Sequence, residues 1–365
     1  MRVRRVNTEY FNLYKEIPLF CALVLRSFFR SRPTEPTNRT LVVNTCLIGE
    51  FAASLPAVRD YIVRHPHTTV DLMVAPPLRP LAERVRGVGQ VYTARSLYGR
   101  KSEGASEAAE RLGPYDQIFV MRISPDVYRI LSRVTAGRVR TGLREYSGYA
   151  LHLWGSLLSR RLPKQWSTLN FEMLGGKEKH IPFEDIIDYS PEDDARVGAL
   201  EPFHGAGKRI IIHTGASWLM KHWRADRWTA LLERLHALGN ISFIFVGGEG
   251  DRAEHEAIAA KLPFKVYSLI GSIDLLDLSL VLRKSDYFIG VDSGPRNLAH
   301  LVGLRSVCIF GPGPHFYMPS DPRDIVLDKT RGRGVLQMFF YSRHSLIDQI
   351  SVDEVYDGFM KVWNS

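Results

Sequence analysis

Short apolar runs rich in Val, Ile and Phe alternate with amphipathic stretches along most of the chain. In the first half, these runs predict strands at 41–44, 70–74, 91–92 and 117–121. The stretches between them predict helices at 51–64, 78–86 and 106–112. A second series predicts strands at 209–213, 241–246, 287–291 and 306–310, and helices at 228–238, 254–261, 296–302 and 352–362. Strands that alternate with helices over short connections favour parallel sheets covered on both faces.

The regular alternation is lost between residues 165 and 205, where glycines and prolines gather. A chain of 365 residues also favours two domains over one. We therefore expect four parts: an N-terminal basic and apolar segment with a linker, a first α/β domain, a second α/β domain, and a C-terminal helix. Their expected bounds are 1–39, 40–190, 191–345 and 346–365.

The segment 286–314 contains a complete strand, turn, helix and strand, which is a βαβ unit. Its turn is Asp292-Ser293-Gly294-Pro295, and the residues after it predict a helix. Ligands of such sheets bind beyond the carboxyl ends of the strands. Small residues followed by the free N–H groups of a helix are suited to holding a phosphate.

Three pieces of this segment carry a family resemblance: Asp-Ser-Gly-Pro, Asn-Leu-Ala and Phe-Gly-Pro. In this order they resemble the signature of the bacterial heptosyltransferases, glycosyltransferase family nine, and weaker matches extend the resemblance over roughly residues 40–345. The resemblance implies an α/β protein of the GT-B fold, in which two Rossmann-like domains have parallel sheets that face each other across a cleft. It implies an inverting, metal-independent enzyme that transfers heptose from ADP-heptose to an anionic lipopolysaccharide-type or other cell-envelope glycan. No cofactor is expected besides this nucleotide-sugar substrate.

Two candidate catalytic residues follow from the resemblance. Glu50, in Gly49-Glu50, stands where the family has an Asp that is thought to be the general base, and both are carboxylates able to take a proton from an acceptor hydroxyl. The longer side chain would displace the base by about 1 Å, so Glu50 is either a working base on a shifted frame or a sign of lost activity. A carboxylate that only balances the dipole of its helix is a third reading. Lys221 stands where the family has a Lys that neutralises the leaving diphosphate.

The expected nucleotide-sugar site draws on four loops. It comprises Thr214, Gly215, Ser217, Lys221, Glu249, Asp251, Ile273, Asp292, Ser293 and Gly294. Either Glu249 or Asp251 would match the family's acidic ribose ligand, and Ile273 would contact the base. Asn297 replaces a family His, and His300, one helical turn away, is either its substitute or a packed helix residue.

The net charge of +9 is concentrated in two places. Residues 122–164 contain nine basic residues against two acidic ones, and residues 1–39 contain eight against three. Clustered positive charge indicates an anionic partner. We assign acceptor binding to Arg122, Arg138, Arg140 and Arg144, because guanidinium groups bind carboxylates and phosphates in a bidentate manner; a solvated surface would explain the same charges.

Residues 17–29 are almost wholly apolar, but thirteen residues are too few to span a bilayer as a helix, which takes about 20. Two alternatives remain open: residues 10–32 lie at the inner face of the cytoplasmic membrane as an interfacial helix, or they pack on the protein's own core. No secretory signal is evident, and the three cysteines fit neither a metal site nor a disulfide framework. We therefore expect a cytoplasmic protein, peripheral on the inner membrane in the first alternative.

Two other functions fit parts of the sequence. An inactive sugar-nucleotide-binding protein of the same fold would explain Glu50 and Asn297 together. A nucleic-acid-binding protein would explain the basic charge, but the basic segment lacks interleaved aromatic residues and any known motif, so we expect no nucleic-acid partner. The spacing of His, Cys and acidic residues also predicts no metal site.

Overall fold

The computed structural model describes residues 9–28, 33–96, 112–141, 165–216, 221–311, 321–329 and 346–364. Ser217, Arg144 and most of the helix predicted at 106–112 lie outside this part of the chain. The described residues divide into two compact units, the first ending at Asp188 and the second beginning at Tyr189. Each unit is built on one sheet, and the strand pairs described in both are parallel.

The first unit contains a five-stranded sheet with the order β3-β2-β1-β4-β5. Its strands are β1 Arg39–Asn44, β2 Thr69–Val74, β3 Val88–Thr93, β4 Tyr115–Val120 and β5 Ala136–Thr141. Its helices after β1 are α2 Ile48–Arg64, α3 Arg79–Ala82, α4 Pro125–Leu131, α6 Trp166–Met173 and α7 Phe183–Ile186. The four strands predicted here are confirmed. β5 was not predicted, because this edge strand carries Arg138 and Arg140 in place of an apolar run.

The helix predicted at 78–86 is shorter than expected. A 3-10 turn at Pro76–Leu78 leads into the four residues of α3, and the chain then leaves the helical path. Val85 forms an antiparallel bridge with Ile187, and the N–H of Arg86 donates to the carbonyl of Ile186 at 2.8 Å. Pairing with a distant segment therefore ends the helix, which local sequence cannot reveal.

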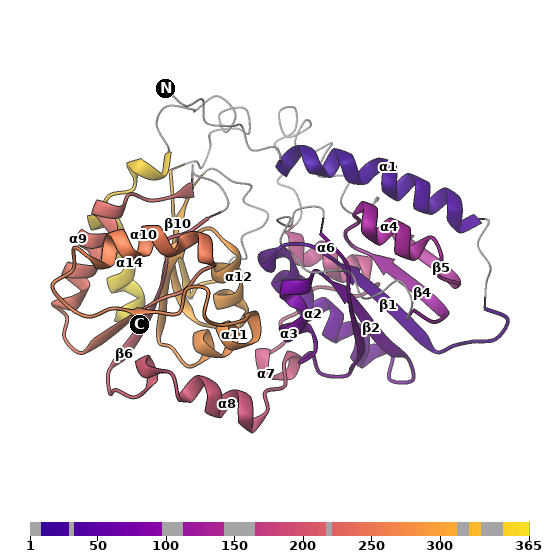
Figure 1. Ribbon diagram of the computed structural model, residues 1–365, viewed down its shortest axis with the longest axis horizontal. Coiled ribbons are helices and arrows are strands. Elements are labelled where there is room, and N and C mark those ends of the chain that lie inside the picture. Colours follow the sequence, from indigo (N-terminus) through magenta and orange to yellow (C-terminus); the bar gives the residue numbers. More distant parts are fainter. Residues whose placement is uncertain are drawn as a thin grey trace. The chain divides into compact units, whose positions relative to one another are not determined.

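The N-terminal helix α1 (Glu9–Phe28) packs on the first unit, beside α4 and β5 (Figure 1). Phe20 and Leu23 are buried in the core that the sheet and α4 share. One face of this helix therefore packs on the protein's own core, which is one of the two alternatives that the sequence left open. Pro18, Cys21 and Leu25 lie on the opposite face and are exposed.

The expected linker is also held in place where it meets β1. The carboxylate of Asp116, in β4, accepts hydrogen bonds from the N–H of Thr37 at 2.8 Å, its hydroxyl at 3.0 Å and the N–H of Asn38 at 2.8 Å. Residues 37 and 38 thus belong to the first unit.

The second unit contains a six-stranded sheet with the order β11-β10-β9-β6-β7-β8. Its strands are β6 Lys208–His213, β7 Ile241–Phe245, β8 Tyr267–Ser268, β9 Tyr287–Val291, β10 Arg305–Phe310 and β11 Asp324–Asp328. Its helices are α8 Pro191–Gly198, α9 Ala225–His236, α10 Arg252–Ala259, α11 Leu275–Arg283, α12 Gly294–Leu301 and α14 Val352–Trp363. All the strands and helices predicted in this half are confirmed; the short β8, β11, α8 and α11 were not predicted.

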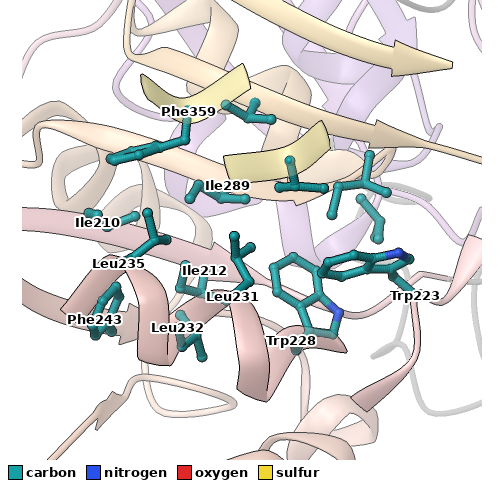
Figure 2. Close-up of a cluster of buried hydrophobic side chains, with 14 of the residues drawn as sticks. Ile210, Ile212, Trp223, Trp228, Leu231, Leu232, Leu235, Phe243, Ile289 and Phe359 are labelled. Carbon is teal, nitrogen blue, oxygen red and sulfur yellow. The ribbon is translucent and has the colours of Figure 1, made fainter. Parts of the chain in front are cut away.

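The core of this unit fixes the chain next to the expected donor site (Figure 2). Helix α9 places Trp228, Leu231 and Leu235 against the isoleucines of β6. Trp223 packs edge-on against Trp228 and donates its indole N–H to the carbonyl of Ile350 at 3.0 Å. Because Trp223 follows Lys221 by two residues, this buried anchor limits where the lysine can lie.

Each sheet has one point at which the chain reverses its direction of strand addition. In the first unit this point lies between β1 and β4, and in the second it lies between β6 and β9. Helices that leave such neighbouring strands cover opposite faces, which opens a crevice beyond their carboxyl ends. The loops after these four strands are therefore where ligands are expected.

Candidate active site

An ion pair spans the reversal point of the second sheet. Lys221, in the segment that follows β6, places its ammonium 2.5 Å from the carboxylate of Asp292, the first residue after β9. The two side chains are only 15% and 8% exposed. The structure thus brings together two predicted donor-site residues that are 71 positions apart in the sequence.

Asp292 leads directly into the amino end of α12. Ser293 is the N-cap, but its hydroxyl makes no capping bond and is buried without a hydrogen-bond partner among the described residues. Pro295 has no N–H, and the N–H of Asn297 donates to the carbonyl of Ser293 at 3.3 Å. The N–H groups of Gly294 and Arg296 remain without a partner in this part of the chain. Open donors at the positive end of a helix suit a phosphate.

Asp251 has a structural role in the loops after β6 and β7. Its carboxylate accepts a hydrogen bond from the N–H of Gly248 at 2.9 Å. It also lies against Gly215, where a Cβ would come within 2.1 Å of its Oδ1 atom. Gly215 is therefore required for this close approach, which joins the loops after β6 and β7.

Glu249 lies on the neighbouring side of the loop and is exposed. Arg252 binds it in a bidentate manner, with N···O distances of 2.6 and 2.7 Å, and this hydrogen bonding holds the pKa of Glu249 below its usual value. Arg252 also donates to the carbonyl of Ile270 at 2.8 Å, which brings Glu249 next to Gly271. Half-buried Ile273 follows two residues later. Of the two carboxylates considered for the ribose, Glu249 is the more accessible.

Two histidines support the loop after β6. His213, at the end of the strand, is buried and donates from Nδ1 to the carbonyl of Val246 at 2.8 Å. Burial lowers the pKa of His213, so its ring is neutral at physiological pH. His222 contacts Glu254 and Ala216. No role was predicted for His222 or Glu254, although the position of His222 directly after Lys221 was a usable signal.

The predicted base and one predicted acceptor ligand form an ion pair in the first unit. Glu50 lies in the first turn of α2, and its Oε1 accepts a hydrogen bond from Arg122, which follows β4. The guanidinium carbon of Arg122 lies 4.9 Å from the centre of the Trp166 ring. This pair spans the reversal point of the first sheet, as Lys221 and Asp292 do in the second. Trp166 was not predicted.

The other acceptor candidates are on β5. Arg138 is exposed, and Arg140 is half-buried and donates to the carbonyl of Glu172 at 3.1 Å. Both therefore lie on the edge strand next to β4.

Comparison with known proteins gives this geometry a family. The model of "Glycosyltransferase family 9 (heptosyltransferase)" matches residues 115–333, more than half of the chain. The chain belongs to glycosyltransferase family 9. It is 21% identical over 283 residues to lipopolysaccharide heptosyltransferase 3 of Escherichia coli, covering 74% of this chain and 82% of that protein.

Solved structures place the fold among the GT-B heptosyltransferases. A family 9 glycosyltransferase from Veillonella parvula superposes with a TM-score of 0.71 at 15% identity, over 92% of this chain and all of that one. E. coli heptosyltransferase WaaC, solved with ADP-2-deoxy-2-fluoro heptose, gives a TM-score of 0.63 at 18% identity, over 90% of this chain and 100% of that one. This family 9 protein is a glycosyltransferase with a two-sheet α/β fold.

The described residues contain no cluster of three or more His, Cys, Asp or Glu side chains that could hold a metal ion. Among their helices, none is both long and apolar enough to span a bilayer.

A buried charge cluster lies between α12 and β11, and His300 contacts its central carboxylate. The carboxylate of Asp324, in β11, contacts Arg296 at 3.2 Å, His300 at 2.7 Å and Ser306 at 2.5 Å. Arg296 and Asp324 are 0% and 1% exposed. His300 therefore joins α12 to β11, while the amide oxygen of Asn297 faces Arg296 at 3.5 Å.

The cluster around Asp324 is expected to stabilise α12. We expect Arg296→Met to lower the free energy of unfolding by about 3–5 kcal/mol, because it leaves Asp324 buried without its arginine. Arg323→Met removes an arginine that is 42% exposed and paired with Asp321, and should cost less than about 1 kcal/mol. Denaturant titrations of both variants test the difference, and equal losses would contradict it.

Proposed function

We propose that this protein transfers heptose from ADP-heptose to an anionic glycan of the lipopolysaccharide type, with inversion at the anomeric carbon and without a metal ion. The observation that carries the proposal is the half-buried Lys221 ammonium, paired with the residue that leads into the open amino end of α12. Support for the donor comes from WaaC, whose structure contains an ADP-heptose analogue. Support for the acceptor comes from the E. coli relative, which is a lipopolysaccharide heptosyltransferase.

The second unit would hold the donor. Its diphosphate would lie at the amino end of α12, where Ser293 and the N–H groups of Gly294 and Arg296 donate hydrogen bonds. Thr214, Gly215 and Ser217 would contribute from the loop after β6. Glu249 would bind the ribose and Ile273 would contact the base, while Asp251 keeps the loops in position.

The first unit would hold the acceptor. Glu50 takes the proton of the attacking hydroxyl while the new bond forms between that oxygen and the anomeric carbon. The bond from this carbon to the β-phosphate oxygen breaks on the opposite face, and ADP leaves with the electron pair. Arg122 would orient the Glu50 carboxylate through Oε1. Arg138, Arg140 and Arg144 would bind acidic groups of the acceptor.

Charge that develops on the leaving diphosphate needs a stabilising partner. Lys221 and the dipole of α12 supply positive charge at this position, which is the work a divalent cation does in metal-dependent transferases. We therefore assign stabilisation of the leaving group to Lys221.

The donor site is tested by calorimetry with ADP, UDP and GDP in the presence of EDTA. We expect selective binding of ADP, and a loss of about 10- to 100-fold in affinity in Lys221→Met because a charge-assisted contact to phosphate is removed. Lys208→Met is the matched control, since Lys208 is 53% exposed and paired with Asp286 in the same unit. Absence of ADP binding, or equal affinity in both variants, would refute the donor site.

The base is tested by transfer of heptose from ADP-heptose to heptose-deficient lipopolysaccharide. Glu50→Gln should reduce kcat by about 10²- to 10⁴-fold, because the amide cannot accept the proton. Its affinity for ADP should match that of the wild type. Glu83→Gln, at an exposed carboxylate paired with Arg79, should retain full activity. A fully active Glu50→Gln would assign the proton transfer elsewhere, and an inactive wild type that binds ADP would favour a sugar-nucleotide-binding role.

We also propose that the exposed face of α1 binds the inner face of the cytoplasmic membrane. Pro18, Cys21 and Leu25 are exposed and fall on one side of the helix, at a spacing of three and four residues. Residues 1–39 carry a net positive charge, and exposed Arg26 lies beside Leu25. Apolar side chains bordered by basic ones favour the surface of an anionic bilayer.

Vesicle co-sedimentation tests this face. Leu25, 64% exposed, is replaced by Glu, and we expect binding to phosphatidylglycerol-containing vesicles to fall about 10-fold or more, since an apolar contact is lost and a like charge is added. Val63→Glu is the control, at another exposed apolar residue (56%) of the same unit. Equal binding of the two variants would contradict this role for α1.

A further inference from the structure

His222 makes two short contacts, one from each ring nitrogen. Nδ1 lies 2.8 Å from Oε2 of Glu254, in α10, and Nε2 lies 2.8 Å from the carbonyl oxygen of Ala216. The N–H of Ala216 is farther from Nε2, at 3.4 Å. The ring thus connects α10 to the loop that follows β6.

Both close partners are hydrogen-bond acceptors. A neutral imidazole has one N–H and can donate to only one of them, whereas the imidazolium ion donates to both. In the neutral form with the proton on Nδ1, Nε2 would face the Ala216 carbonyl with its lone pair and could accept only from the more distant N–H. The observed distances therefore correspond to the protonated ring.

The electrostatic surroundings favour the same form. The hydrogen bond to Glu254 raises the pKa of His222 above its ordinary value of 6.5, and the contact with Ala216 adds to this effect, while burial opposes it. Asp251 also raises the pKa of His222. The neighbouring His213 adds no opposing charge, because burial, and to a lesser extent the charge of His222, lower its own pKa.

The connected loop is the one to which phosphate binding is assigned. Ala216 directly follows Thr214 and Gly215, and the carboxylate of Asp251 lies against Gly215 from the side of α10. Lys221 directly precedes His222, and Trp223, directly after it, is fixed in the core. A carbonyl that accepts from His222 is also unavailable to face and repel a phosphate oxygen.

We propose that His222 is a positioning residue of the donor site: its imidazolium holds the loop 214–216 against Glu254 of α10, and loss of this proton weakens binding of a nucleoside diphosphate. This inference rests on the proposed donor site and adds a dependence on one proton. A group whose pKa is raised by folding contributes below its unfolded value, and its contribution disappears as the pH rises through the folded value. We call the connection Glu254–His222–Ala216 the imidazolium strap. It is therefore present in mildly acidic solution and lost in alkaline solution.

Calorimetry with ADP from about pH 6 to about pH 9 tests the proposal on wild type, His222→Gln and Glu254→Gln. We expect His222→Gln to bind ADP on the order of 10-fold more weakly than wild type at the acidic end, and the two affinities to converge at the alkaline end. The ionisation of ADP affects the wild type and every variant equally. The ratio of wild-type to His222→Gln affinity therefore reports the ionisation of His222 alone. The affinity of Glu254→Gln for ADP should fall to that of His222→Gln at a lower pH than the wild-type affinity does. His204→Gln, at an exposed histidine of the same unit, should follow the wild type.

A ratio that stays constant with pH, or an unchanged affinity in His222→Gln, would overturn the proposal. NMR titration of the histidine ring protons gives a measurement that needs no ligand, with the His222 signal assigned from its loss in His222→Gln. Titration above the ordinary value in wild type, and at lower pH in Glu254→Gln, would support the imidazolium strap; titration at or below the ordinary value would overturn it. Failure of the wild type to bind ADP with an intact strap would instead refute the donor site.

Discussion

The arrangement of the candidate site in each unit depends on one constraint of parallel sheets: the carboxyl ends of neighbouring strands meet at one edge. Where strand order reverses, the two loops that leave this edge diverge and their first side chains can meet across the gap. Glu50 and Arg122 meet in this way between β1 and β4, and Lys221 and Asp292 between β6 and β9. Such largely buried pairs add little to stability, because desolvation offsets their attraction. Their consequence is that a carboxylate and an ammonium are held in defined positions before any substrate arrives.

The sequence was sufficient for the parts of the fold that depend on local patterns. Val- and Ile-rich runs identified the central strands, and the Asp292-Ser293-Gly294 turn identified the donor-site helix, because a buried strand and a small-residue turn leave a clear local signal. The edge strand β5 has alternating arginines and no such signal. The partner of Glu50 could not be predicted either, since Arg122 belonged to a basic segment whose charge suggested acceptor binding. The order of the strands decides which cationic side chain meets which carboxylate. Local sequence patterns do not predict this order.

Four cationic side chains around the proposed donor site each have an acidic partner among the described residues. Lys221 is matched by Asp292, Arg296 by Asp324 and Arg252 by Glu249, while His222 faces Glu254. In the proposed donor site, the N–H groups and dipole of α12 would therefore add to the attraction of Lys221 for a diphosphate, since the first turn of this helix contains no acidic residue. Asp292, two residues before Gly294, holds the ammonium of Lys221 at a defined position close to this helix end.

The glutamate at position 50 gains a physical explanation from its partner. A longer side chain has one more rotatable bond, so an unrestrained Glu would hold a proton-accepting oxygen less precisely than an Asp on the same turn. Arg122 removes much of that freedom by binding Oε1, and its own guanidinium is restricted by burial and by the ring of Trp166. The second oxygen, Oε2, has no hydrogen-bond partner among the described residues and is available to an acceptor hydroxyl. The departure from the family's Asp is therefore accompanied by a contact that restricts the longer side chain, which favours a working base over a lost one.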